Sequence, residues 1–377
     1  MDKSHREAIG QAQRLVVKAG SNVVTREGRV NTRLLTHLAE DITSLSHQGK
    51  QVVVISSGAV SAGLGRLGLG GAGQDLPMRQ AAAAVGQAEL MAAYHRIFHR
   101  LKQPIAQLLI TQADISERGR YLHLRNTLST LLEQMRVVPI LNENDPVRFG
   151  DDAIGENDRL AALIAARLDA DLLVLLSDVD GLYTANPHTD PGAKLIPTVT
   201  QITADLLQAA TDSVSGVGRG GASAKLDAAR LAMNSGVYTV VANGGVRHAL
   251  SRVICGEQVG TVFVPRAGKL RARKRWIGFA LRPKGQLVVD DGAVHALTRR
   301  GSSLLPAGIV AVHGEFSQGD PVSVVSLAGR EVARGLANYD SQEIERIRGC
   351  HTGDIESLLG HHHYDEVLHR DNLVVMS

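Results

Sequence analysis

Aromatic residues and cysteines are scarce in this sequence of 377 residues: phenylalanine, tyrosine and tryptophan together make up 3% of it, and there are two cysteines. Cys255 and Cys350 cannot form a zinc site by themselves and do not resemble a disulfide framework. A hydrophobic core must therefore rest on valine, leucine, isoleucine and alanine. Together with 39 glycines, this composition is typical of an α/β protein with buried strands and many tight turns between strand and helix.

An excess of one charge and long apolar runs are also lacking. The 41 basic and 38 acidic residues give a net charge of +3, which is too small to mark the whole chain as a nucleic-acid binder. Residues 1–14 carry mixed charges and lack the apolar run of a secretory signal. The longest strongly apolar stretch, residues 172–176, is far shorter than the roughly 20 residues that span a bilayer. We therefore expect a cytoplasmic protein with no membrane partner.

Short apolar runs alternate with longer amphipathic stretches from residue 15 to about residue 265. The runs are Leu15–Val17, Gln51–Ile55, Ile105–Ile110, Val137–Leu141, Leu172–Leu176 and Tyr238–Val241. Helical periodicity fills the gaps, for example over residues 120–135 and 157–168. This alternation predicts an α/β fold with a mostly parallel sheet covered by helices on both faces. In such folds, ligands bind at the carboxyl ends of the strands.

The character of the sequence changes near residue 266. Residues 266–300 contain ten lysines and arginines against two acids. The segments Gln286–Asp290, Gly308–Val312, Pro321–Ser326 and Glu331–Gly335 then have the pattern of short strands. We therefore predict two domains, 1–265 and 266–377, the second being a linker followed by a small, mostly β domain.

Glycine-rich or polar turns follow the predicted strands. Lys18-Ala-Gly20-Ser21-Asn22 follows the first strand, and Ser56-Ser57-Gly58-Ala59-Val60 follows the second. Glycine permits close approach of the backbone, and a helix that starts there offers free N–H groups, so both turns suit anionic ligands. Polar residues also follow the fourth and fifth strands, at Asn142–Pro146 and Ser177–Tyr183.

Two well-known nucleotide motifs do not account for these turns. The Walker A pattern is absent from the sequence. Gly63-Leu-Gly65-Arg-Leu-Gly68 matches GxGxxG, but the preceding strand ends near Ser56, and no acidic residue follows at the end of a next strand as the dinucleotide fingerprint requires. Glycine loops with two distant lysines, Lys18 and Lys225, therefore indicate a phosphate site of another design.

The combination of motifs resembles the amino-acid kinase family, and in particular its glutamate 5-kinase branch. The resemblance is carried by Val16-Val17-Lys18-x-Gly20, Ser57-Gly58-Ala59, Asn142-Glu-Asn-Asp145, Asp178…Gly181-Leu-Tyr183 and Asp212-Ser-Val-Ser-Gly216. It extends into the last third of the chain, where Arg273-Lys-Arg-Trp276 and Gly301-Ser-Ser-Leu-Leu-Pro306 resemble a PUA domain. The implied fold is a three-layer sandwich with a small, mostly β PUA domain.

Two departures from the family pattern are visible. The nucleotide loop of the family usually reads G-T-G-G-M-x-T-K, whereas this chain has Gly218-Arg-Gly-Gly-Ala-Ser-Ala-Lys225. The first loop usually reads K-x-G-T/S-S, and Asn22 takes its last place here. The lysines and glycines are retained, so the departures bear on nucleotide affinity more than on the type of reaction.

The resemblance implies transfer of the γ-phosphoryl group of ATP to the γ-carboxylate of L-glutamate, which is the first step of proline biosynthesis. It places Lys18 and Lys225 on either side of the transferred group, and we expect Asp158 to lie between them as an organiser. The substrate residues it implies are Ser57, Asp145 and Asn157. The nucleotide residues it implies are Lys18, Ser177, Asp178, Arg219, Gly220, Gly221, Ala222, Ser223, Ala224 and Lys225.

The resemblance also implies cofactors and partners. ATP and Mg²⁺ are the expected cofactors, with the ion carried on the phosphates and no resident metal site in the protein. Proline is the implied feedback inhibitor. Association with glutamate-5-semialdehyde dehydrogenase and a homo-oligomeric state are the further expectations.

Several of these residues also have purely structural interpretations. Ser57 and the pair Asn157-Asp158 are suitable helix caps, and Asp145 before Pro146 is typical of a turn. The run His361–His363 fits a solvated tail better than a metal site. The basic segment 271–275 with Trp276 resembles an RNA-binding patch, although the acidic stretch after it argues against RNA.

Two alternative functions stay open at this point. One is another amino-acid kinase, which differs in its substrate. The other is an RNA-binding PUA protein with a decayed kinase domain, for which Ala222 and Ala224 are the only hints.

Overall fold

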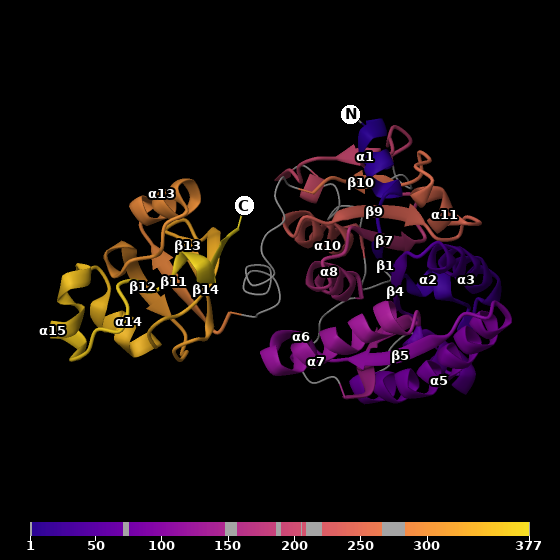
Figure 1. The fold of residues 1–377 in the computed structure, drawn as a ribbon, viewed down its shortest axis with the longest axis horizontal. Helices are drawn as coiled ribbons and strands as arrows, with labels where there is room; N and C mark the ends of the chain where they lie inside the picture. Colours follow the sequence, from indigo (N-terminus) through magenta and orange to yellow (C-terminus); the bar gives the residue numbers. More distant parts are fainter. Residues whose placement is uncertain are drawn as a thin grey trace. The chain divides into compact units, whose positions relative to one another are not determined.

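The computed structural model describes residues 2–70, 75–147, 157–185, 190–204, 206–208, 221–265 and 283–376. The chain divides into two compact units, Met1–Lys269 and Leu270–Ser377 (Figure 1). The domain boundary predicted at residue 266 falls at the edge of residues 266–282, which lie outside the described part, as does the basic segment with Trp276. Its exact position therefore stays a prediction.

The first unit is built on an eight-stranded sheet. In spatial order its strands are β5 (Ile105–Ile110), β6 (Val138–Glu143), β4 (Gln51–Ser56), β1 (Arg14–Ala19), β7 (Leu172–Ser177), β9 (Tyr238–Asn243), β10 (Thr261–Phe263) and β8 (Thr198–Val199). Every neighbouring pair is parallel except β10 with β9. All six predicted strands are present, and the prediction of a mostly parallel sheet is confirmed.

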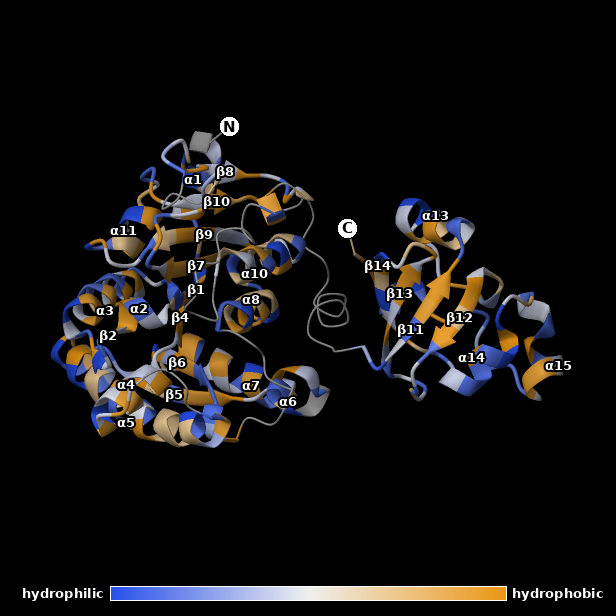
Figure 2. Ribbon diagram, turned by 180° about the vertical axis from the view of Figure 1, so that it is seen from behind, coloured by the Kyte–Doolittle hydropathy of each residue, from blue (hydrophilic) through white to orange (hydrophobic). Residues whose placement is uncertain are grey.

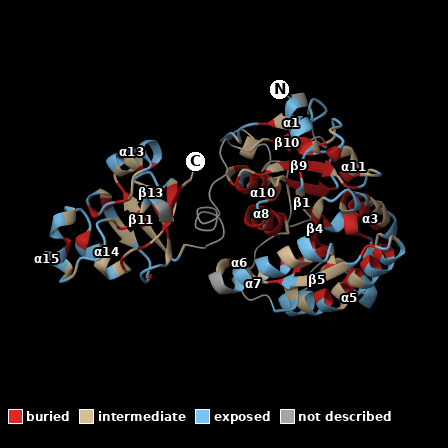
Figure 3. Cartoon of the chain, in the orientation of Figure 1, coloured by how far each residue is buried: buried red, intermediate tan, exposed pale blue. Residues whose placement is uncertain are grey.

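Helices cover both faces of this sheet. The apolar side chains of β1 alternate between the faces, and Leu15, Val16 and Val17 are fully buried. Leu15 and Val17 belong to a core shared with α3 (Thr32–His47), α5 (Leu76–Arg100) and α11 (Ala249–Ile254). On the other face, α8 (Asn157–Arg167) packs against β1 and α10 (Ala222–Asn234), and both helices are largely buried (Figure 3).

Shorter elements complete the unit. They are α1 (Asp2–Gly10), α2 (Ser21–Val24), β2 (Thr25–Arg26), β3 (Arg29–Val30), α4 (Ala59–Leu67), α6 (Gln112–Ser116), α7 (Arg118–Ser129) and a 3-10 turn at Asp145–Val147. The helix expected over residues 120–135 is α7, which continues as a π-turn over Thr130–Gln134. None of the described helices combines the length and the apolar character needed to cross a membrane.

The glycines of the GxGxxG match serve close backbone packing and the end of a helix. Gly63 and Gly65 lie on α4, which crosses α5 so closely that a Cβ atom at Gly63 would meet the Ala82 carbonyl oxygen at 1.8 Å. A Cβ atom at Gly86 of α5 would meet the Ala59 carbonyl oxygen at the same distance. A Cβ atom at Gly65 would meet the Gly28 carbonyl oxygen at 1.9 Å, and Gly68 is the left-handed cap that ends α4. The three glycines of the match thus have structural roles.

Replacing Gly86 by alanine should destabilise the protein, because the backbones of α4 and α5 would have to separate. Overpacking of this kind typically costs about 1–3 kcal/mol. Gly70→Ala is the matched control, since a Cβ atom there meets nothing within 4 Å, and it should change the free energy of unfolding by less than about 0.5 kcal/mol. Urea unfolding followed by circular dichroism measures both variants, and equal stabilities would contradict the packing interpretation.

The second unit has its own five-stranded sheet and core. The strand order is β12 (Ile309–His313), β11 (Gly285–Val289), β13 (Pro321–Ser326), β14 (Glu331–Leu336) and β15 (Leu373–Val375). The four predicted strands are all present, and apolar residues line both sheets of the protein (Figure 2). The described part of the unit also contains three α-helices that we did not predict: α13 (Asp291–Arg300), α14 (Ser341–Ile347) and α15 (Ile355–Leu359).

The histidine run belongs to the folded second unit. The Nε2 atom of His361 lies 2.9 Å from the Glu343 carboxylate, and its ring stacks on Tyr339. The chain then continues through the buried Val367 and Leu368. His362 and His363 are exposed, as expected of solvated histidines, but the segment is not a tail, because the residues that follow the histidines complete the core.

Candidate active site

Polar side chains from distant parts of the first unit meet at the carboxyl edge of its sheet. Parallel strands all end at this edge, and helices α8 and α10 begin there, so the arrangement follows directly from the topology (Figure 1). The residues concerned are Lys18 on β1, Ser57 after β4, Asn142 at the end of β6, Asn157 and Asp158 at the start of α8, Ser177 at the end of β7 and Lys225 in the first turns of α10.

Asp158 lies between two lysine ammonium groups. Its Oδ1 atom is 2.7 Å from the Nζ atom of Lys18, and its Oδ2 atom is 3.6 Å from the Nζ atom of Lys225. The Asp158 side chain is 1% exposed, and the two lysine side chains are 10% and 12% exposed. Neither carboxylate oxygen accepts a conventional hydrogen bond from the described residues, so the two ammonium groups are its neutralising contacts.

This arrangement holds two like charges close together in a poorly solvated place. Buried charges are costly unless they are paired, and removal of one partner leaves the other uncompensated. The position of Asp158 in the first turn of α8 adds the favourable interaction of a carboxylate with a helix N-terminus. Asp158 thus holds two cations beside each other, where both can contact a further anion.

Asn157 ties together the ends of three elements. Its Nδ2 atom donates hydrogen bonds to the Ser56 carbonyl oxygen at 2.9 Å, the Ser57 hydroxyl at 2.9 Å and the Oδ1 atom of Asn142 at 3.0 Å. The helix cap after β4 is Gly58, with φ +95°. Ser57 is not the cap, so the cap interpretation of this serine does not hold. Its hydroxyl instead accepts the hydrogen bond from Asn157.

Four members of this network, Asn142, Gln87, Ser56 and Tyr94, were not among the predicted site residues. Asn142 is 2% exposed, and its amide donates to the Oε1 atom of Gln87 at 2.9 Å. Behind it, the Ser56 hydroxyl lies 3.0 Å from the Tyr94 hydroxyl. Burial raises the pKa of Tyr94 to about 12, although the hydrogen bond with Ser56 acts in the opposite direction. The position of Asn142 at a strand end was a usable signal, whereas nothing in the sequence marks Gln87.

Asp145 follows the same strand as Asn142. It is half-buried and begins the 3-10 turn Asp145–Val147 beyond β6. The structure thus places it at the carboxyl edge of the sheet with the other candidates. Its predicted contact with the substrate stays a prediction.

A second group of polar residues surrounds Asp178 at the end of β7. Ser177 donates to its Oδ1 atom at 3.0 Å, and the amide of Asn22 donates to its Oδ2 atom at 2.6 Å. Desolvation raises the pKa of Asp178, but these hydrogen bonds and the charge of Lys225 outweigh it and hold the pKa below its usual value. Asn22 is the residue that departs from the family pattern in the first loop. It hydrogen-bonds Asp178, a predicted nucleotide residue, and the sequence did not reveal this contact.

The loop before Lys225 is described only in part. Arg219 and Gly220 lie outside the described residues. Gly221 is the cap of α10, and Ala222, Ser223 and Ala224 form the first turn of this helix. Their predicted role in nucleotide binding is untested by the geometry.

Comparison with known proteins identifies the first unit. Residues 13–243 match the Amino acid kinase family. The chain belongs to this family. The match includes every predicted site residue, and residues 285–359 of the second unit match the PUA domain.

Several members of the family are similar to this chain over nearly its full length. The glutamate 5-kinase of Caldanaerobacter subterraneus is 45% identical over 96% of this chain and 98% of the relative. The glutamate 5-kinase of Moorella thermoacetica is 45% identical over 100% and 99%, and that of Geobacter sulfurreducens is 46% identical over 98% and 99%. The similarity therefore spans both units of the chain.

Proposed function

We propose that this amino acid kinase transfers the γ-phosphoryl group of ATP to the γ-carboxylate of L-glutamate and so forms γ-glutamyl phosphate, the first intermediate of proline biosynthesis. The observation that carries the proposal is the buried arrangement of Lys18, Asp158 and Lys225. It occurs in a chain whose full-length relatives are glutamate 5-kinases. The alternative of a decayed kinase is disfavoured, because both lysines are retained and both contact the Asp158 carboxylate.

The chemistry requires charge neutralisation more than proton transfer. The acceptor carboxylate of glutamate has a reference pKa near 4.3 and is ionised at neutral pH. No general base is needed to activate it. Phosphoryl transfer instead requires in-line positioning and stabilisation of the charge that spreads over the transferred oxygens. Two ammonium groups held by one carboxylate provide that stabilisation without reorganisation during the reaction.

The remaining residues position the two substrates. In the proposal, Asp145 receives the α-ammonium group of glutamate, and Ser57 and Asn157 hydrogen-bond its polar groups. Ser177 and Asp178 contact the nucleotide together with residues 219–225. Both oxygens of Asp158 face lysines, so this carboxylate is poorly suited to ligate Mg²⁺, and the ion would be carried by the ATP phosphates.

Family membership supports four further elements of the proposal. Proline is a feedback inhibitor that acts at or near the glutamate site. The protein is a homo-oligomer and works in the cytoplasm. Glutamate-5-semialdehyde dehydrogenase receives the product, which as an acyl phosphate hydrolyses or cyclises readily if it is not consumed.

Substrate preference tests the proposal directly. With ATP, Mg²⁺ and hydroxylamine, which traps acyl phosphates as hydroxamates, glutamate should be a far better substrate than aspartate or N-acetylglutamate. Acetylation removes the α-ammonium group and with it the proposed charged hydrogen bond to the half-buried Asp145, an interaction that typically contributes about 1.5–3 kcal/mol. A preference for N-acetylglutamate or aspartate would identify a different amino acid kinase.

A chain truncated after Pro265 should remain folded and form hydroxamate. Every proposed site residue precedes this point, and the two units have separate hydrophobic cores. Hydroxamate production per mole of folded protein, compared with the full chain, measures the effect. An insoluble or inactive truncation beside an active full chain would show that the second unit is needed for the site.

A further inference from the structure

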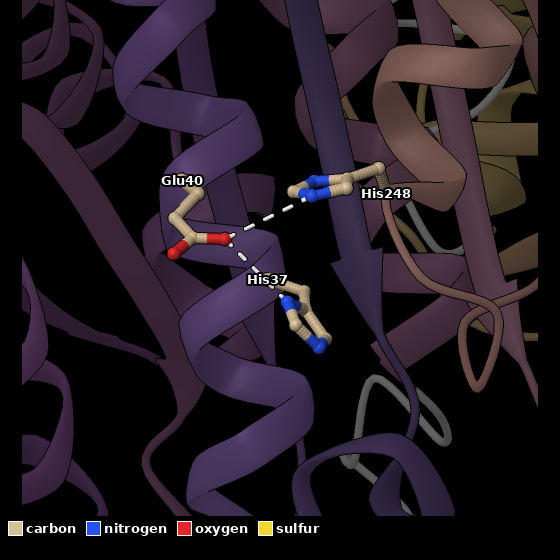
Figure 4. A group of neighbouring side chains, drawn as sticks. All are labelled: His37, Glu40 and His248. Carbon is tan, nitrogen blue, oxygen red and sulfur yellow. Dashed lines mark hydrogen bonds and ion pairs between the residues drawn. The ribbon is translucent and has the colours of Figure 1, made fainter.

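Two histidines and a glutamate gather on the first unit outside the candidate active site. His37 and Glu40 are three residues apart on α3 and therefore share one face of this helix. His248 comes from the connection between β9 and α11 (Figure 4). The Oε2 atom of Glu40 lies 3.4 Å from the Nδ1 atom of His37 and 4.0 Å from the Nε2 atom of His248. One oxygen thus faces both imidazole rings.

The donor set is that of a transition metal. Two imidazole nitrogens and one carboxylate oxygen are ligands that suit Zn²⁺, Co²⁺ and Ni²⁺, whereas Mg²⁺ and Ca²⁺ prefer oxygen alone. One ligand atom from each residue lies within 4.8 Å of the others. In a tetrahedral site with bonds of about 2.0 Å, ligand atoms are about 3.3 Å apart. Small rotations of partly exposed side chains are enough to close that difference.

Asp41 fixes the orientation of His248. Its Oδ1 atom is 2.7 Å from the Nδ1 atom of His248, and the carboxylate is 3% exposed. Ser251 donates to the same carboxylate through its hydroxyl at 2.7 Å and its backbone N–H at 3.2 Å. A proton on Nδ1 is thereby directed to Asp41, which leaves the Nε2 lone pair facing Glu40. This carboxylate–histidine arrangement is the one that usually supports a metal-binding imidazole.

The backbone at His248 is also unusual. Its φ of +54° is left-handed, a conformation that residues other than glycine seldom adopt. Four other described residues that are not glycine also adopt it, so the conformation sets the course of the chain and does not by itself mark a site. The conformation lets the chain turn from β9 into α11 with the imidazole directed toward α3, where its ring centre lies 5.4 Å from that of His37.

We propose that His37, Glu40 and His248 bind a divalent transition-metal ion of the zinc class, with Asp41 as the residue that orients His248. Water would supply the remaining ligand. The ion would connect α3 to the beginning of α11, two elements that already pack together. The competing interpretation is a protonated His248 paired with Glu40 and Asp41, which needs no metal.

Zinc binding by the full chain tests this proposal. Equilibrium dialysis against micromolar ZnCl₂ should leave one tightly bound ion per chain. Because His361–His363 could also attract zinc, the same measurement is made on the variant His361→Gln/His362→Gln/His363→Gln, which should retain the ion. Co²⁺ in place of Zn²⁺ should give visible absorption bands of a four-coordinate site in both proteins.

Substitutions in the cluster should remove or weaken this binding. Glu40→Gln and His248→Gln should each weaken zinc affinity by at least tenfold, and Asp41→Asn by about 10- to 100-fold, the usual loss when a partner of a metal-binding histidine is changed. His47→Gln, at an exposed position on the same helix, is the matched control and should bind as wild type. Circular dichroism confirms that each variant is folded.

Thermal unfolding provides a second readout. At free zinc of 100 times the dissociation constant of the wild type, the unfolding equilibrium constant of the wild type should fall by about 100-fold, and that of Glu40→Gln should fall by no more than about tenfold under the same conditions. Absence of zinc binding at micromolar concentration, loss of zinc with the three C-terminal histidines, or normal affinity in both Glu40→Gln and His248→Gln would each overturn the proposal.

Discussion

Replacement of Lys225 by alanine is expected to lower kcat by roughly 10²–10³, which is the usual loss for one preorganised donor that stabilises developing charge. The reason is that its ammonium group, held 3.6 Å from Asp158, interacts more strongly with the transferring phosphoryl group than with the bound substrates. Lys18→Ala should lower kcat by a similar factor. The KM for glutamate should change much less, because other groups hold this substrate. Steady-state hydroxamate kinetics measure both constants.

Two further variants define what the lysines contribute. Arginine at either position should restore little activity, since its planar guanidinium does not fit the place of a compact ammonium group. Lys194→Ala is the control, because Lys194 is an exposed lysine of the same unit, and its kcat should equal that of the wild type. A normal kcat in folded Lys225→Ala would make this residue a surface lysine and remove it from the mechanism.

Replacement of Asp158 by asparagine should produce the second large effect. The side chain keeps its shape but loses the negative charge that neutralises the two lysine ammonium groups. Loss of one member of a buried ion pair typically costs about 3–5 kcal/mol. We therefore expect a lower melting temperature and a fall in kcat of at least about 10², comparable to loss of one donor. Differential scanning fluorimetry and hydroxamate kinetics measure the two effects.

A double-mutant cycle separates the organising role of Asp158 from a direct one. If Asp158 acts by holding Lys225, the variant Asp158→Asn/Lys225→Ala should lose much less activity than the product of the two single losses, because residues that act as a unit are not additive. It should also be more stable than Asp158→Asn, since one unpaired charge is gone. Fully multiplicative losses would show that the two residues act independently.

Much of the first unit could be predicted from its sequence. Each central strand is a short apolar run, and the side chains at the ends of parallel strands must meet at one edge. The strand ends marked Lys18, but the resemblance to the family was needed to bring Lys18 and Lys225 into one site. Charge then called for a carboxylate between the two cations, and Asp158 was the candidate for it.

Contacts made between elements were harder to foresee. Gln87 on α5 reaches Asn142, and Asn22 reaches Asp178, but each is an ordinary polar residue in its own segment. The close packing of Gly63 against α5 likewise depends on a helix crossing that no local pattern encodes. The helices of the second unit were missed because α14 and α15 have seven and five residues, too few to show a clear helical period.

The central position of β1 in the sheet determines when the sheet can form during synthesis of the chain. This strand is made before its neighbours β4 and β7, and Lys18 is made before Asp158 and Lys225, the other two charged groups of the site. Translation proceeds at about 5–20 residues per second, so the 207 positions between the two lysines take roughly 10–40 s to make. During that interval the nascent chain contains β1 and Lys18 before the strands that flank β1 and the charged groups beside Lys18 have all been made. A chain interrupted between Ser177 and Gly221 would have both neighbours of β1 and the carboxylate of the site, but only one of its two cations.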